Sequence, residues 1–305
     1  MIHLTMIFHK LTESNTQMLA LTSNRKVHIF DRMISSKKIL INGFIVTVVG
    51  MSLFTWVMIN EVDNTRYAVD ITAHRGSSKE APENTLASLD TAILHGASYA
   101  EIDVQETKGG GVVLTHDESL ERVTGLDKMV WQVGLEEIQA LDAGAWFDSK
   151  FIGEKMPTLE EAMDYSKGRL KLNIEIKVHG HERLIIGQVV KLIQEKNYYK
   201  ECVVTSLDYD VLQEIERLDS KIKTGYVMAI ALGNLEQLNV DFYSVEESNV
   251  TESFVSNAHL IGREVHVWTI NSKASMEKML DLGVDNIITD NDRMLSDLIR
   301  TLNAM

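Results

Sequence analysis

Cysteine and basic residues are scarce in this sequence, and each shortage excludes a class of protein. The 305 residues include one cysteine, Cys202, so no disulfide bond can form within the chain. Cys202 stands in an apolar run, where we expect a small buried side chain and not a catalytic thiol. The 30 Lys and Arg residues are outnumbered by 44 Asp and Glu, which gives a net charge of −14. So acidic a chain argues against nucleic acid as a partner, and an anionic phosphate substrate would require a local positive site.

Charge of either sign is missing from Ile39 to Asn60. A helix of this length would measure about 33 Å, which is enough to cross a bilayer. A helix in a protein core rarely lacks a charged face over six turns. A cleaved signal peptide is disfavoured because the preceding segment is long and no small-x-small site follows. The sequence therefore predicts a transmembrane helix at residues 39–60, after an N-terminal segment of residues 1–38.

The charges on the two sides of this run predict its orientation. The first sixty residues hold six Lys and Arg against two Asp and Glu, and several of the basic ones, such as Lys37 and Lys38, directly precede the run. Glu61 and Asp63 follow it, and Trp56 near its end suits a membrane interface. The positive-inside rule then places residues 1–38 in the cytoplasm and residues 61–305 outside it. We expect a single-pass protein of the cell membrane with an extracytoplasmic domain.

Short apolar segments alternate with helical patterns from residue 69 onward. We predict strands at Val69–Ala73, Tyr99–Asp103, Leu170–Ile176, Cys202–Thr205, Lys223–Val227, Asp241–Val245, Val265–Trp268 and Asn286–Thr289. We predict helices at Thr85–His95, Glu182–Lys196, Tyr209–Leu218, Thr251–Ile261, Lys273–Leu282 and Arg293–Thr301. Eight short strands with helices between most of them indicate an α/β fold, a parallel (β/α)8 TIM barrel formed by residues 61–305.

A glycine-rich turn, Lys108–Gly111, interrupts this alternation after the second strand. The chain returns through Val112–Thr115, which we predict as a hairpin strand outside the barrel. If the hairpin closes near Lys108–Gly109, His116 lies opposite Glu101, although the glycines leave the register open by a residue or two.

Residues 117–168 would then form an insertion whose tip overhangs the strand ends. We predict helices within it near Leu135–Ala140 and Thr158–Ser166. Its aromatic residues could face a substrate, but packing of the insertion onto the barrel is their more common role; they are Trp131, Trp146 and Phe147.

Polar side chains gather at the ends of the first two predicted strands. His74 and Arg75 follow the first strand, and Glu101 and Asp103 lie in the second. Alternate residues of a strand share a face, so the two carboxylates point the same way, and holding them together is costly without a cation. Oxygen ligands favour a hard divalent ion, Mg²⁺ or Ca²⁺. With His116 nearby, the cluster suits cleavage of a phosphodiester.

The third predicted strand repeats this pattern. In Leu172–Lys177 every second residue is apolar and would face the outer helices. Asn173, Glu175 and Lys177 then face the barrel axis, where polar groups need a ligand, a metal ion or one another. Active sites of such barrels lie at the carboxyl ends of the strands, which brings these residues together.

These residues form motifs that resemble those of the glycerophosphodiester phosphodiesterase family. Four motifs occur in order over fewer than fifty residues: His74-Arg75-Gly76, Pro82-Glu83-Asn84-Thr85, Glu101-Ile102-Asp103-Val104 and His116-Asp117. Further matches are Ile174–Lys177, Val267–Asn271 and Ile287–Asp290, so the resemblance covers about residues 68 to 300. The sequence departs from the usual pattern at Lys108-Gly109, where an aspartate before the glycine is common, and at Asn291, where proline is usual.

The resemblance implies a membrane-anchored, metal-dependent hydrolase that converts a glycerophosphodiester to an alcohol and glycerol 3-phosphate. It implies that one divalent cation, Mg²⁺ or Ca²⁺, is held by Glu101, Asp103 and Glu175. It also implies an acid/base pair of His74 and His116, without indicating which of them gives the proton. Some members carry a multi-spanning membrane domain, and residues 1–60 are similar to the end of such a domain.

The remaining roles follow from the same resemblance. Arg75 and Lys177 would bind phosphate oxygens, Arg75 through a bidentate fork. Trp268 would form a wall of the pocket. We expect Glu83 and Asn84 to cap the first helix and brace the loop before it.

Two other functions remain open at this point. One is a lysophospholipase D that acts on lipids of the membrane. The other is a non-catalytic module that binds phosphate or polyglycerophosphate, which would not need the pair of histidines.

Overall fold

The computed structural model describes residues 44, 48–52, 67–231 and 235–304. The chain divides into two units, Met1–Arg66 and Tyr67–Met305. The segment predicted at 1–38 lies outside the described residues, as does most of the span predicted at 39–60, of which Phe44 and residues 48–52 are described as helical and exposed. Within the described part of the chain, no helix has the length and apolar character needed to cross a membrane.

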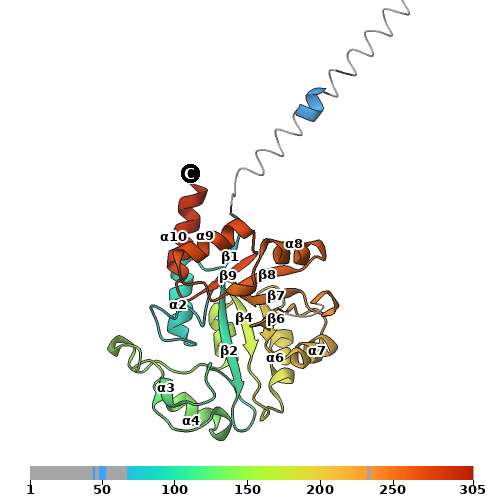
Figure 1. The fold of residues 1–305 in the computed structure, drawn as a ribbon. Helices are drawn as coiled ribbons and strands as arrows, with labels where there is room; N and C mark the ends of the chain where they lie inside the picture. Colours follow the sequence, from blue (N-terminus) through green and yellow to red (C-terminus); the bar gives the residue numbers. More distant parts are fainter. Residues whose placement is uncertain (1–43, 45–47, 53–66, 232–234, 305) are drawn as a thin grey trace, which may run out of the picture. The chain divides into compact units, whose positions relative to one another are not determined.

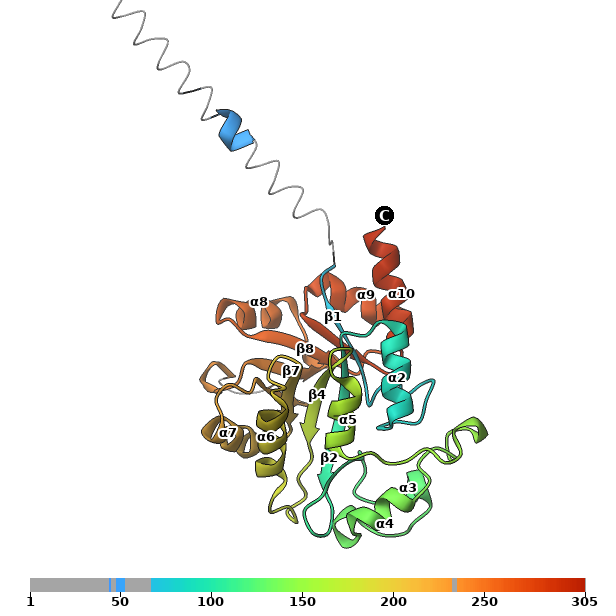
Figure 2. The same ribbon diagram turned by 180° about the vertical axis from the view of Figure 1, so that it is seen from behind.

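Eight parallel strands of the described residues close into a barrel (Figures 1 and 2). The strands are β1 (Asp70–Ala73), β2 (Tyr99–Glu106), β4 (Lys171–Ile176), β5 (Cys202–Ser206), β6 (Thr224–Met228), β7 (Phe242–Glu246), β8 (Glu264–Trp268) and β9 (Asn286–Thr289). The barrel is closed because β1 pairs with both β9 and β2. The predicted strands therefore agree with the observed ones to within one to three residues at each end.

Helices cover the outside of the barrel. They are α2 (Leu86–His95), α5 (Leu159–Ser166), α6 (Ile185–Lys196), α7 (Tyr209–Leu218), α8 (Glu252–Leu260), α9 (Lys273–Leu282) and α10 (Asp292–Asn303). The apolar core lies between these helices and the strands, and inward-facing strand residues fill the barrel. In the described part of the β6–β7 connection, a single 3-10 turn at Leu235–Gln237 takes the place of an α-helix.

The hairpin after β2 has a register that differs by one residue from the predicted one. β3 (Val112–Leu114) runs antiparallel to β2, with Val104 opposite Leu114 and Glu106 opposite Val112. The Thr115 N–H donates to Asp103 O, so Asp103 lies opposite Thr115, one position away from the alignment that would set Glu101 opposite His116. Glycines 109 to 111 give the turn no side-chain pattern that would fix its centre, and the observed register lies within the one or two residues that the sequence left open.

The insertion after β3 has a small hydrophobic core of its own. Its helices α3 (Glu121–Thr124) and α4 (Leu135–Ala140) lie beside the arrowhead end of β2 in Figure 1. Its core residues include Leu120, Val130 and Ile138, all fully buried. The insertion therefore packs against the carboxyl end of the barrel, as the sequence predicts.

The insertion aromatics pack on protein groups. Trp131 stacks on His181 with ring centroids 4.2 Å apart. The Arg122 guanidinium lies 5.3 Å from the centre of the Trp146 ring, which also contacts Phe147. The contacts of these three aromatic residues therefore indicate that they pack the insertion.

Candidate active site

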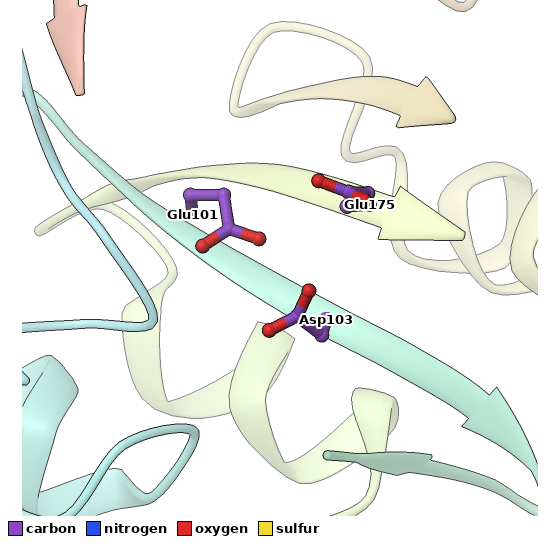
Figure 3. Close-up of side chains that lie close together, drawn as sticks. All are labelled: Glu101, Asp103 and Glu175. Carbon is purple, nitrogen blue, oxygen red and sulfur yellow. The ribbon is translucent and has the colours of Figure 1, made fainter. Parts of the chain in front are cut away.

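Three carboxylates meet inside the carboxyl end of the barrel. Glu101 and Asp103 come from β2, and Glu175 comes from β4, where it pairs in register with Asp103 (Figure 3). One oxygen of each carboxylate lies within 4.8 Å of the others. Glu101 and Asp103 are almost completely buried, so the chain pays a desolvation cost to bring these groups together.

The pKa values of these carboxyl groups report that cost. Burial raises the pKa of Glu101 well above its ordinary value, and repulsion from Asp103 and Glu175 adds to the effect. Burial and the charge of Asp103 also raise the pKa of Glu175. Burial would raise the pKa of Asp103 too, but the charges of Lys177, His116 and Arg75 lower it below its ordinary value. The nearby cations therefore favour the ionised form of Asp103.

The donor set fits a hard divalent cation. Oε1 of Glu101 is buried and has no hydrogen-bond partner among the described residues, which is unusual for a buried carboxylate oxygen. Oxygen atoms from three carboxylates are the ligands that Mg²⁺ and Ca²⁺ prefer. The cluster that the sequence predicts as a metal site is thus assembled in the structure, and its residues could hold one ion.

Lys177 lies beside the same cluster. Its Nζ is 2.6 Å from Oε1 of Glu175 and 3.1 Å from Oδ1 of Asp103. Burial alone would lower the pKa of Lys177, but the two carboxylates raise it above its ordinary value, so the side chain is a cation. Asn173, Glu175 and Lys177 all line the same cavity, as the alternation in β4 predicts.

Arg75 and Gly76 make a sharp turn directly after β1. Both residues have left-handed backbone, with φ of 56° and 75°. A Cβ atom at Gly76 would overlap the side chain of Ser88, so only glycine fits there. The turn lets the Arg75 N–H donate to Oε2 of Glu101 at 2.8 Å and places Arg75 Nε 3.5 Å from Oδ2 of Asp103.

His74 is paired with a carboxylate that sequence reasoning gave no role. Its Nδ1 lies 2.6 Å from Oδ1 of Asp290, which follows β9. Asn271 and Ser78 donate to Asp290 at 2.5 and 3.3 Å. Although burial opposes it, the hydrogen bond with His74 holds the pKa of Asp290 below its ordinary value. Since Nδ1 is engaged, Nε2 of His74, 4.0 Å from Oε2 of Glu101, is the nitrogen free to exchange a proton.

His116 has the same arrangement on another wall. Its Nδ1 lies 2.8 Å from Oδ1 of Asp117, and the other oxygen of Asp117 accepts from Arg122 at 2.5 Å. Burial would raise the pKa of Asp117, but the hydrogen bonds from Arg122 and His116 lower it. Each histidine thus holds a carboxylate at Nδ1, which fixes the ring and its tautomer.

Glu83 and Asn84 have roles that differ from the predicted cap of the first helix. Thr85 caps α2, and its side chain accepts from the Ser88 N–H. Asn84 instead exchanges two hydrogen bonds with Asp103, at 2.9 and 3.0 Å. Glu83 accepts hydrogen bonds from Arg75 and from Arg122, so it connects the two arginines. It is not one of the three clustered carboxylates. Both residues brace the loop, but the capping prediction was wrong because the chain enters the helix one residue later.

A cavity of about 210 Å³ joins these groups. Its lining contains every predicted site residue, namely His74, Arg75, Glu101, Asp103, His116, Glu175, Lys177 and Trp268. The sequence did not indicate the partners Asp117 and Asp290, although both stand in motifs that it singled out.

Comparison with known proteins agrees with this geometry. Residues 74–293 match the model of the glycerophosphoryl diester phosphodiesterase family. The chain is 35% identical over 240 residues to a glycerophosphodiester phosphodiesterase of Caldanaerobacter subterraneus, which covers 75% of this chain and 97% of that one. It is 29% identical over 245 residues to one of Bacillus subtilis, which covers 72% of this chain and 82% of the relative.

Solved structures give the same result. An Oleispira antarctica phosphodiesterase in complex with the product sn-glycerol-3-phosphate superposes with a TM-score of 0.71 at 30% identity, over 76% of this chain and 96% of that one. A glycerophosphodiester phosphodiesterase of Thermotoga maritima gives a TM-score of 0.62 at 27% identity, over 75% and 98%. The chain therefore belongs to the glycerophosphoryl diester phosphodiesterase family, a family of phosphoric diester hydrolases.

Proposed function

We propose that this protein hydrolyses glycerophosphodiesters to an alcohol and glycerol 3-phosphate with the aid of one divalent cation. The observation that carries the proposal is the pair of histidines on the walls of one cavity, each with its Nδ1 on a carboxylate. A module that only binds phosphate has no need of two groups prepared in this way for proton transfer.

The cationic side chains would receive the phosphate. Lys177 and Arg75 both line the cavity, and each already balances part of the carboxylate charge there. A phosphate diester carries one negative charge, so a site lined by Glu101, Asp103 and Glu175 would repel it without these cations. Arg75 donates from Nη1 to Glu83, and its Nε lies 3.5 Å from Oδ2 of Asp103, so these two carboxylates hold its guanidinium in place.

The two histidines would divide the proton transfers. In the hydrolysis the bond between phosphorus and the alcohol oxygen breaks, and a new P–O bond forms to the oxygen of a water molecule. One imidazole takes a proton from this water, and the other gives a proton to the alcohol oxygen as it leaves. Asp290 and Asp117 would stabilise whichever ring is charged at each stage.

Glu101, Asp103 and Glu175 would hold the cation, which we propose to be Mg²⁺ or Ca²⁺. Such an ion stabilises negative charge on phosphoryl oxygens. Asn84 would keep Asp103 in position through its two hydrogen bonds.

Hydrolysis of glycerophosphocholine by the full chain tests this function. We expect turnover with added Mg²⁺, Ca²⁺ or Mn²⁺, loss of turnover after chelation, and recovery when the ion is restored. Asp103→Asn should weaken cation binding in calorimetry, while Asp285→Asn, which lies away from the cluster, should not. Full activity after exhaustive chelation would overturn the metal assignment.

We further propose that residues 39–60 anchor the protein in the cell membrane, with residues 61–305 on the extracytoplasmic side. The uncharged run of Ile39–Asn60 and the basic residues before it support this arrangement. A single cysteine placed at the exposed Asn257 of a Cys202→Ala chain would test it. We expect an impermeant maleimide to label it in intact cells, whereas labelling only after lysis would put the domain in the cytoplasm.

A further inference from the structure

Two larger cavities adjoin the catalytic one on different sides. One, of about 720 Å³, shares His116, Lys177 and Leu207 with the catalytic cavity, and we name it the wide cavity. The other, of about 440 Å³, shares His74 and Arg75, and we name it the polar cavity. A phosphate diester has two organic substituents, so a phosphate in the catalytic cavity would extend one of them into each neighbour.

The linings of the two cavities differ in chemistry. Apart from the shared His74 and Arg75, the polar cavity is lined only by side chains that donate or accept hydrogen bonds: Ser78, Lys79, Glu83, Asn271, Asp290 and Asn291. These suit the hydroxyl groups of glycerol. The wide cavity adds apolar side chains, among them Val178 and Leu207, and it is larger. It therefore suits the alcohol, which is the part of the substrate that varies.

Two carboxylates of the wide cavity lack a strong cationic partner. Glu118 is half exposed and contacts His179 at 3.1 Å. Asp208 is exposed and accepts from the Asp210 N–H at the start of α7. Within residues 67–231 and 235–304, neither forms an ion pair with a lysine or an arginine. Asp117, by contrast, is already paired with Arg122.

Two tyrosines line the same cavity as these carboxylates. Tyr209 and Tyr226 meet edge to face, with ring centroids 5.6 Å apart, and both line the wide cavity. Aromatic faces attract ammonium groups, and carboxylates near them add to the attraction. A neutral alcohol would gain neither interaction.

We propose that the wide cavity binds the alcohol part of the diester and selects alcohols that carry a positive charge, such as a quaternary ammonium or a primary ammonium group. This inference rests on the proposed hydrolysis of glycerophosphodiesters. It places the leaving alcohol on the side of His116 and the glycerol on the side of His74. His116 then gives its Nε2 proton to the alcohol oxygen, which keeps the electron pair of the broken P–O bond.

The test compares a cationic with a neutral leaving alcohol. Values of kcat/KM for glycerophosphocholine and for glycerophosphoglycerol are measured with the full chain and saturating Mg²⁺. We expect the ratio of the two values to fall about tenfold in Glu118→Gln/Asp208→Asn, since a carboxylate that is in contact with solvent contributes up to about fivefold. Asparagine also caps helices, so the start of α7 should be preserved.

The matched control is Glu121→Gln/Asp210→Asn. It removes two carboxylates from the same two segments, but both are exposed and neither lines the wide cavity. The ratio should stay within twofold of the unaltered protein. A second pair of variants tests the ring: Tyr226→Leu should lower the ratio, and Tyr226→Phe should keep it.

The outcomes separate this inference from the function on which it rests. If the unaltered protein hydrolyses both substrates and the ratio is the same in the carboxylate variant, its control and Tyr226→Leu, the wide cavity does not select charge and the inference fails. If the unaltered protein hydrolyses neither substrate with any divalent ion, the proposed function itself fails.

Discussion

The two halves of the barrel contribute different chemistry to one cavity. The half formed by β1, β2 and β4, with the β3 hairpin strand that lies outside the barrel, supplies its histidines, cations and carboxylates. The half formed by β5 to β9 lines the same cavity with uncharged side chains: Thr205, Leu207, Val227, Ser244, Trp268, Thr269 and Ile288. We name these the charged half and the neutral half.

The difference shows how the fold limits the cost of burying charge. In the charged half, nearly every ionic group touches one of opposite sign, so desolvation is offset locally. The neutral half needs no such compensation and can fix the shape of the cavity by packing alone. Changes at the charged groups should therefore act on the rate, and so should changes at Asp290, which follows β9 but holds His74. Changes at the uncharged lining residues of the neutral half should act on substrate binding or on stability.

The largest effect among the substitutions outside the catalytic pair is expected at Asp290. Asp290→Asn removes the charge that holds His74 at Nδ1, and we expect kcat to fall about 100-fold. Steady-state kinetics would measure this change.

The matched control for this prediction is Asp285→Asn. Asp285 forms a similar contact, 2.8 Å, with His259, but neither residue lines the catalytic cavity. Its variant should keep kcat. A near-normal kcat in Asp290→Asn would mean that the carboxylate does not act through His74.

A smaller effect is expected at Trp268, in the neutral half. Trp268→Ala removes a wall of the cavity that we expect to contact the substrate equally in the ground state and in the transition state. KM should therefore rise about tenfold while kcat changes little. Trp268→Phe keeps an aromatic wall and should change kcat/KM less than about threefold. A fall in kcat of two orders of magnitude in either variant would contradict the division between the halves.

The smallest effect on the rate is expected at Gly225, deeper in the neutral half. A Cβ atom there would lie 2.1 Å from the Phe242 ring, which stacks on His266 with ring centroids 4.0 Å apart. Gly225→Ala should therefore cost about 1–3 kcal/mol of the free energy of unfolding. The kcat of the folded protein should stay nearly unchanged. Denaturant unfolding would measure the loss of stability.

Gly187→Ala in α6 is the control for that experiment. Nothing lies within 4 Å of its Cβ position, so alanine should be neutral or stabilising by up to about 1 kcal/mol. If both variants lose the same stability, close packing at Gly225 is not the cause.

The sequence predicted the barrel well because two features identify its strands. Each is a short run of apolar residues, and several end in polar residues that packing does not require, such as His74 and Arg75. The alternation in Leu172–Lys177 also placed Glu175 and Lys177 correctly in the cavity. Patterns within one segment were therefore sufficient for the strands and for the carboxylate cluster.

Three features that no pattern within one segment reveals were not predicted. The role of Asp290 follows from β9 pairing with β1, which brings residues 216 positions apart to 2.6 Å. The hairpin register depends on a turn without side chains. The bracing of Asp103 by Asn84 requires a left-handed backbone at Asn84, with φ of 56°. Asparagine permits this conformation, but the residue type alone does not predict it.

The central claim is that the charged half holds two histidines with opposite tasks in proton transfer. His74→Ala and His116→Ala should each lower kcat for glycerophosphocholine at least about 100-fold, because each task contributes about 10²–10⁴-fold. Neither should change cation affinity much, since both lie outside the carboxylate cluster. The double variant should lose less than the product of the two single losses.

The most direct measurement compares these variants on a diester with a nitrophenol leaving group. Nitrophenol leaves without needing a proton, so the account predicts that His116→Ala recovers most of its activity on this substrate and that His74→Ala does not. Near-normal turnover of glycerophosphocholine by His116→Ala would contradict the acid/base pair. Loss of the cation in calorimetry of His116→Ala would instead make His116 a ligand, and recovery of His74→Ala alone would reverse the two tasks.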